Sequence, residues 1–317
     1  GVNVLVWRQG AHAAALGFEP WLLQPPARAD FHAPSPAIAH LQEAVAREPA
    51  RVFGLHANLT PGWNSAYGLE AIYGPDALQN TWVRQLIDVS PVKWNSSWRL
   101  YVPAREVAAA RPFLDALNVR YYVDMVNDRE TVARTLRLRQ SADLDIFESP
   151  TAWPRAYFTD RIETYDAPAD LMPRLLARNG VPLAAVQRAD TAAAAVAATL
   201  PTLSPASAEP TPVVAATGYA LRTNSTSFTV RASGPGLAVL HEAWWPDSFQ
   251  AEVDGRRVPI IRVNHAFQAV PIASAGEHRV TFSYWPRHFV RALLCSSIGA
   301  VILLLSFLLA LRPARPA

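Results

Sequence analysis

The chain has 317 residues, of which 50% are hydrophobic and 17% charged, so it is long enough to form two domains with cores of their own. Its net charge of +3 is too small to indicate a nucleic-acid-binding surface, which excludes nucleic acid as an expected partner. The single cysteine, Cys295, lies in an apolar run near the C-terminus, which excludes disulfide and thiol chemistry elsewhere in the chain.

Residues 1–35 predict an irregular segment, because "EPWLLQPPARADFHAPSP" contains too many prolines for regular structure. The chain opens with "GVNVLVWRQG" and lacks the basic region followed by a long apolar region that is typical of a signal peptide. Either a segment has been removed before Gly1 or the chain is the tail of a longer protein; because of its C-terminal features we expect the second, with residues 1–35 close to a membrane.

Residues 36–189 predict an α/β domain, because helical and strand patterns alternate along this part of the chain. Ser35 and Pro36 are typical of a helix N-cap and first turn, and a strand is expected at 51–55. The further expected elements are a helix over 76–89 capped by Asp76, a helix ending near Asn118, a strand over 119–125, strands in "LDIFESP" and "PRAYFTD", and a helix in "APADLMPRLLARNG" that stops at Gly180.

The composition changes at Asp190, and residues 190–216 predict an Ala/Pro-rich linker. Residues 217–285 predict a small antiparallel β-sandwich, because seven short alternating runs are separated by turn residues. Asp254–Gly255 is a strong hairpin signal between two of these runs. The expected fold class is thus α+β, with an α/β domain followed by the sandwich.

Residues 286–317 predict a transmembrane helix and a short basic tail, which makes the lipid bilayer an expected partner. The run from Ala292 to Leu311 has no charge, is apolar around its whole circumference, and is long enough to cross a bilayer core of roughly 30 Å. Two arginines precede it and two follow it, so the charge pattern does not decide its orientation.

No catalytic residue, metal ligand or cofactor is predicted from this sequence. His241 and Glu242 invite an acid–base interpretation, but neighbouring residues on a strand point to opposite faces. The eight histidines are scattered without metal-ligand spacing, and no phosphate- or dinucleotide-binding motif is present.

Two loop-like segments of the first domain are candidate glycan-binding sites. They combine aromatic faces, amides and a little positive charge, which suit a glycan or an anionic envelope polymer. The candidate residues are Trp63, Asn64 and Tyr67 in "GWNSAYGLEAIYG" and Trp94, Asn95 and Arg99 in "KWNSSWRLY". We expect them to be partly exposed on one face of the domain that is turned towards the membrane-embedded part of a parent protein; the alternative is that the tryptophans only pack in the core.

The stretch "LHEAWWPDSFQAEVDGRRVPIIRVNHAFQAVPIASAGEHRVTFSYWPRHF" resembles the C-terminal module of the YfhO-like bacterial membrane proteins. That module has an aromatic pair, a VDG hairpin, an Asn-containing turn and a Gly-Glu-His run before a last membrane helix. The upstream segments "RVFGL", "YGLEAIYGPDAL", "LDALNVRYYV" and "PRAYF" follow in the order expected of the family, so the resemblance covers nearly all of the chain. One departure is the turn after Pro246, where Asp247 stands in place of the usual glycine.

The resemblance implies a polytopic glycosyltransferase of the GT-C type, which uses a polyprenyl-phosphate-linked sugar to modify envelope glycopolymers. Its catalytic acidic residue would lie in an early extracytoplasmic loop that this sequence does not contain. The chain would then be the non-catalytic outer region and last span, with its body outside the bacterial plasma membrane and its C-terminus in the cytoplasm. The alternative is a non-catalytic, membrane-anchored carbohydrate- or envelope-binding module.

Overall fold

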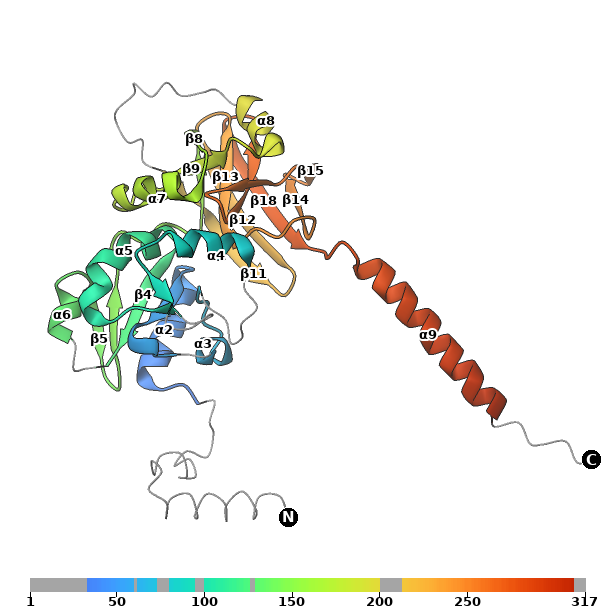
Figure 1. Ribbon diagram of the computed structural model, residues 1–317, viewed down its shortest axis with the longest axis horizontal. Helices are drawn as coiled ribbons and strands as arrows, with labels where there is room; N and C mark the ends of the chain where they lie inside the picture. Colours follow the sequence, from blue (N-terminus) through green and yellow to red (C-terminus); the bar gives the residue numbers. More distant parts are fainter. Residues whose placement is uncertain are drawn as a thin grey trace, which may run out of the picture. The chain divides into compact units, whose positions relative to one another are not determined.

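The computed structural model describes residues 33–59, 62–72, 80–94, 100–125, 129–199 and 213–310. Within them, helices combine with several mostly antiparallel sheets, and one apolar helix lies at the C-terminal end (Figure 1). The α-helices are α2 (Pro36–Arg47), α3 (Trp63–Ala66), α4 (Thr81–Asp88), α5 (Val107–Ala116), α6 (Arg129–Ala133), α7 (Pro168–Ala177), α8 (Thr191–Thr199) and α9 (Phe289–Ala310).

The strands form three larger sheets and two short pairs. Their bounds are β1 (Arg51–Gly54), β2 (Lys93–Trp94), β3 (Leu100–Tyr101), β4 (Val119–Asp124), β5 (Arg137–Ser141), β6 (Asp145–Glu148), β7 (Ala156–Thr159), β8 (Ile162–Tyr165), β9 (Ala184–Gln187), β10 (Val214–Ala215), β11 (Thr217–Arg222), β12 (Ser225–Ala232), β13 (Gly236–Ala243), β14 (Phe249–Val253), β15 (Arg256–Val258), β16 (Ile261–Val263), β17 (Phe267–Ile272) and β18 (Gly276–Tyr284).

A four-stranded mixed sheet, in the order β1-β4-β6-β5, organises the first part of the chain. Only the β1–β4 pair is parallel, so the sheet is less regular than the expected α/β layering. Ile38 and Leu41 of α2 pack in one apolar cluster with β1, β4 and β6, whereas Phe113 of α5 belongs to a second cluster that contains Phe53 of β1. The sheet therefore has apolar partners on both faces, which explains why β1 is buried throughout.

Helix α4 begins later than the sequence pattern predicts. Its N-cap is Asn80, whose side-chain oxygen accepts hydrogen bonds from the backbone N–H groups of Trp82 and Val83. The expected cap, Asp76, lies outside the described residues.

Two five-stranded antiparallel sheets follow, in the orders β10-β7-β13-β17-β16 and β11-β12-β18-β14-β15. The expected Asp254–Gly255 hairpin is confirmed, since Val253 of β14 pairs with Arg256 of β15 and both turn residues have positive φ angles, 52° and 75°. One apolar cluster contains side chains of both sheets, among them Phe228 and Leu240.

Strand β7 corrects the expected division of the chain. It comes from the part assigned to the α/β domain, yet it hydrogen-bonds to β13 on one side and to β10 on the other. All four of its residues are buried, so its backbone groups need partners on both sides, and these are supplied by strands more than 50 positions away. The linker expected over 190–216 thus does not separate two independent sheets, and its first part is helix α8, in which Ala193 is buried.

Helix α9 is the one helix in the described part of the chain that is long and apolar enough to cross a membrane. It begins at Phe289, three residues before the expected Ala292, and its described part ends at Ala310 (Figure 1). The side chains of Phe289–Leu308 are exposed around the helix, which is typical of a span rather than of a core helix.

Candidate functional site

The first candidate loop is built around the short helix α3. Trp63 is 47% exposed, and its ring stacks on that of Tyr67 with centroids 6.4 Å apart and an interplanar angle of 26°. Tyr67 is half-buried and packs against the apolar cluster that contains Ile38 and Leu41, so the solvent-exposed aromatic face belongs to Trp63, supported from below by Tyr67.

Asn64 does not share this exposure and corrects the expectation for this residue. It is 3% exposed, and its Nδ2 donates to the backbone oxygen of Leu69 at 3.0 Å. The side chain therefore stabilises the loop through a buried hydrogen bond to its backbone and is not available to a ligand.

The second candidate loop is described only at its ends. Strand β2 pairs with β3, and Trp94 stands opposite Leu100. Asn95 and Arg99 lie outside the described residues, as does the Trp94 side chain. The structure therefore brings Trp63 and Tyr67 together, and the membership of the other three residues in the same site stays a prediction.

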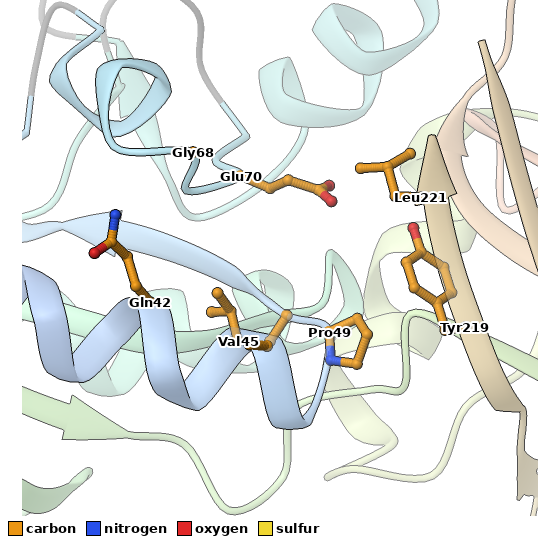
Figure 2. Close-up of a pocket in the computed structure, with 9 residues that line it drawn as sticks. Gln42, Val45, Pro49, Gly68, Glu70, Tyr219 and Leu221 are labelled. Carbon is orange, nitrogen blue, oxygen red and sulfur yellow. The ribbon is translucent and has the colours of Figure 1, made fainter. Parts of the chain in front are cut away.

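A cleft of about 360 Å³ lies beside the first loop (Figure 2). Its walls are the C-terminal half of α2 with Gln42 and Val45, the turn from Gly68 to Glu70, and strand β11 with Tyr219 and Leu221. Figure 2 shows the Glu70 carboxylate pointing across the cleft towards β11. The Gln42 side chain donates to the backbone oxygen of Tyr67 at 2.8 Å, so the cleft and the aromatic loop are directly connected.

The buried side chain of Arg155 contacts the polar groups of two residues that line this cleft, Glu70 and Tyr219. Its buried guanidinium donates to the carboxylates of Glu70 and Glu242, and its Nε lies 3.3 Å from the Tyr219 hydroxyl. Although burial acts to lower the pKa of Arg155, the two carboxylates raise it above its ordinary value. Burial also raises the pKa of Tyr219, so this hydroxyl stays protonated at neutral pH.

The chemistry available in the cleft is hydrogen bonding to a neutral polar ligand. Glu70 offers carboxylate oxygens as acceptors and Tyr219 offers a hydroxyl, and both side chains are hydrogen-bonded to Arg155. No group of three or more His, Cys, Asp or Glu side chains that could hold a metal ion occurs among the described residues.

His241 and Glu242 have different surroundings, in agreement with their expected opposite orientation. The His241 ring is fully buried among Trp153, Tyr157 and Phe267, whereas Glu242 reaches Arg155. Burial, together with nearby arginines, holds the pKa of His241 well below its ordinary value, so the ring is neutral. The pair therefore does not form an acid–base unit.

Sequence reasoning did not identify Glu70, Arg155 or Tyr219. Arg155 meets Glu70 across 85 positions and Glu242 across 87 positions, and no local spacing predicts such contacts. The only available signal was a lone arginine between a proline and a buried strand, "PRAYF".

Comparisons of this sequence with protein-family models, with curated proteins and with solved structures found no match.

Proposed function

We propose that this chain is the extracytoplasmic C-terminal region and the last membrane span of a YfhO-like, GT-C-type glycosyltransferase. The parent would transfer a sugar from a polyprenyl-phosphate carrier to a cell-envelope glycopolymer, and this region would recognise the acceptor without catalysing transfer. The observation that carries the proposal is the short connection between the last strand, β18, and the apolar helix α9. Only four residues separate the end of β18 at Tyr284 from the start of α9 at Phe289, so a helix inserted in a bilayer would hold the body at its surface.

The recognition surface in this proposal is the Trp63–Tyr67 stack together with the adjoining cleft. Exposed aromatic faces bind the apolar faces of sugar rings, and the acceptor oxygens of Glu70 suit sugar hydroxyls. The ion pair with Arg155 fixes the position of the Glu70 carboxylate at the wall of the cleft, which supports a binding role for this side chain.

The architecture proposed for the membrane-proximal body is a β-sandwich formed by the two five-stranded sheets. Its support is the apolar cluster that contains residues of both sheets, such as Phe228 of β12 and Val270 of β17.

The proposed orientation places the body outside the cell and the C-terminus in the cytoplasm. A cysteine-labelling experiment tests it, because Cys295 in α9 is the only native cysteine. In a Cys295→Ser background, Ser274→Cys lies at an exposed position between β17 and β18. We expect a membrane-impermeant maleimide to label this cysteine on intact spheroplasts and to label Ala317→Cys only after permeabilisation. The reverse pattern would contradict the proposed orientation.

The second candidate function is a membrane-anchored carbohydrate-binding module that acts without an attached enzyme. The exposed Trp63 ring, stacked on the half-buried Tyr67, favours it, since this surface could bind a glycan on its own. The reading frame upstream of Gly1 distinguishes the two functions. Many hydrophobic spans with an acidic residue in the first outer loop would support the enzyme, whereas a start codon or a signal peptide directly before Gly1 would support the module.

A further inference from the structure

The turn between β13 and β14 is tied to the segment that leads into α9. The backbone N–H of Trp285 donates to the backbone oxygen of Ser248 at 2.7 Å, and Arg287 forms an ion pair with Asp247 at 2.9 Å. The position of this turn is therefore coupled to the first residues of the helix.

Large aromatic side chains are exposed on both of these connected segments. Trp245 on the turn is 48% exposed, and Tyr284, Trp285 and Phe289 around the helix entry are between 40% and 47% exposed. Tyr284 also contacts the ring of Phe249, and Trp285 contacts that of Phe289. Exposed aromatics gathered in one place mark an interaction surface, and Trp and Tyr are enriched at the boundary between lipid and water.

A cavity of about 360 Å³ opens beside the turn. Trp244, Trp245 and Phe249 form one part of its lining, and the apolar segment 258–260 forms another. Arg257 adds a positive charge to the lining, and its guanidinium donates to the side-chain oxygen of Gln250. The other charged residue of the lining is Asp247, whose carboxylate is paired with Arg287. A cavity that combines apolar side chains with the cation of Arg257 matches the head-group region of a phospholipid, where an anionic phosphate lies next to the start of the acyl chains.

We propose that the Trp244–Phe249 turn is a second membrane contact, seated in the head-group layer beside α9, and that its cavity takes the head group of an anionic phospholipid with the phosphate at Arg257. This inference rests on the proposed role of α9 as a membrane span. Continuity with the helix entry identifies the occupant: with α9 in a bilayer, the Trp285–Ser248 and Arg287–Asp247 contacts hold the turn at the depth of the head groups.

The test uses the full chain reconstituted in phosphatidylcholine vesicles, with tryptophan fluorescence quenched by lipids that carry bromine high on the acyl chain. We expect Trp245→Phe to lower the quenched amplitude by at most about a third, because Trp244 and Trp285 remain as interfacial quenching targets, as do the tryptophans of residues 1–35, which are expected close to the membrane. Trp63→Phe is the matched control, since Trp63 is 47% exposed but lies on α3, and it should leave the quenched amplitude unchanged. An unchanged amplitude in Trp245→Phe would overturn the second membrane contact.

The head-group assignment is tested by comparing brominated phosphatidylglycerol with brominated phosphatidylcholine. We expect Trp245 to be quenched at an apparent lipid concentration about fivefold lower with phosphatidylglycerol, and Arg257→Gln to remove this preference, because one arginine near a lipid surface has an effect of this size. Arg231→Gln, on the exposed side of β12, is the control that should retain it. Equal quenching by both lipids in the native chain would overturn the assignment.

Membrane anchoring itself is measured separately by extraction of the vesicles with alkaline carbonate. Release of the chain would overturn both the anchor and the second contact. Retention of the chain with no quenching of Trp245 would overturn the second contact alone.

Discussion

The guanidinium of Arg51 donates a hydrogen bond of 2.7 Å to the backbone oxygen of His241, which lies 190 positions further along the chain. The Nη1 atom of Arg51 donates to the backbone oxygen of Leu117 at 2.8 Å. Burial and the neighbouring charge of Arg155 lower the pKa of Arg51 to about 10, so it remains charged at neutral pH. One buried cation therefore joins β1 of the four-stranded sheet to β13 of a five-stranded sheet.

Replacing Arg51 should destabilise the whole described body. Arg51→Met leaves two buried carbonyl groups without these donors, so we expect a loss of about 2–4 kcal/mol in the free energy of unfolding. Denaturant titration in detergent measures this loss. Arg105→Met is the control, because the Arg105 side chain is 80% exposed and its removal should change stability by less than about 0.5 kcal/mol. Equal effects of the two substitutions would show that the Arg51 contacts do not stabilise the fold.

The two neighbours Trp63 and Asn64 should respond in opposite ways to truncation. Trp63→Ala removes an exposed ring, so we expect little change in melting temperature and about tenfold weaker binding of envelope glycopolymer fragments. Asn64→Ala removes the buried bond to Leu69, so we expect a loss of about 1–3 kcal/mol in stability. Thermal melts beside calorimetric binding separate the two roles, and intact binding in Trp63→Ala would contradict the proposed recognition surface.

Protonation of His265 should destabilise the fold in acid. Burial and the adjacent Arg262 lower the pKa of this histidine to about 4, while in the unfolded chain its pKa is near 6.5. The unfolded state therefore binds a proton first, and the free energy of unfolding should fall as the pH decreases from about 6.5 towards 4. In His265→Gln this part of the pH dependence should disappear, as measured by denaturant titration at several pH values. A slope that is unchanged in the variant would assign the acid sensitivity to other groups.

His278 should have the opposite pH dependence. The hydrogen bond to Asp254, 2.7 Å from its Nδ1, raises the pKa of His278, so the folded state holds the proton more tightly than the unfolded state. The stabilisation is therefore fully present below a pH of about 6.5 and is lost as the pH rises through the raised pKa. We expect the difference in stability between the native chain and His278→Gln to be larger at pH 5.5 than at pH 8.5. A difference that does not vary with pH would exclude this ion pair as its source.

The turn residue Asp247 should tolerate glycine better than valine. Its φ angle of 56° lies in the left-handed region, which glycine adopts without strain. Asp247→Gly relieves strain of about 1 kcal/mol but loses an exposed ion pair with Arg287, so the net change should be close to zero. Asp247→Val keeps a strained backbone without the ion pair and should cost about 1–2 kcal/mol. Thermal melts of both variants provide the comparison, and equal melting temperatures would contradict the role of the φ angle.

Local patterns in the sequence were sufficient for elements whose cause is also local. The apolar circumference of α9, the Asp254–Gly255 turn and the Pro36 start of α2 depend on nearest neighbours along the chain, so their prediction needed no knowledge of distant contacts. The exposure of Trp63 agrees with its place in a polar loop.

Long-range contacts were decided only by the tertiary structure. The sequence of β7 predicts a short buried strand but does not indicate the sheet to which it belongs. Its pairing with β13 depends on which strand edges are left without a hydrogen-bonding partner in the folded chain. Asn64 looks like a ligand-binding amide in sequence, but it is buried because the loop needs its donor for the oxygen of Leu69. Likewise Arg155 becomes the charge centre of the cleft only because folding buries it between Glu70 and Glu242, where a lone cation would be unstable without both carboxylates.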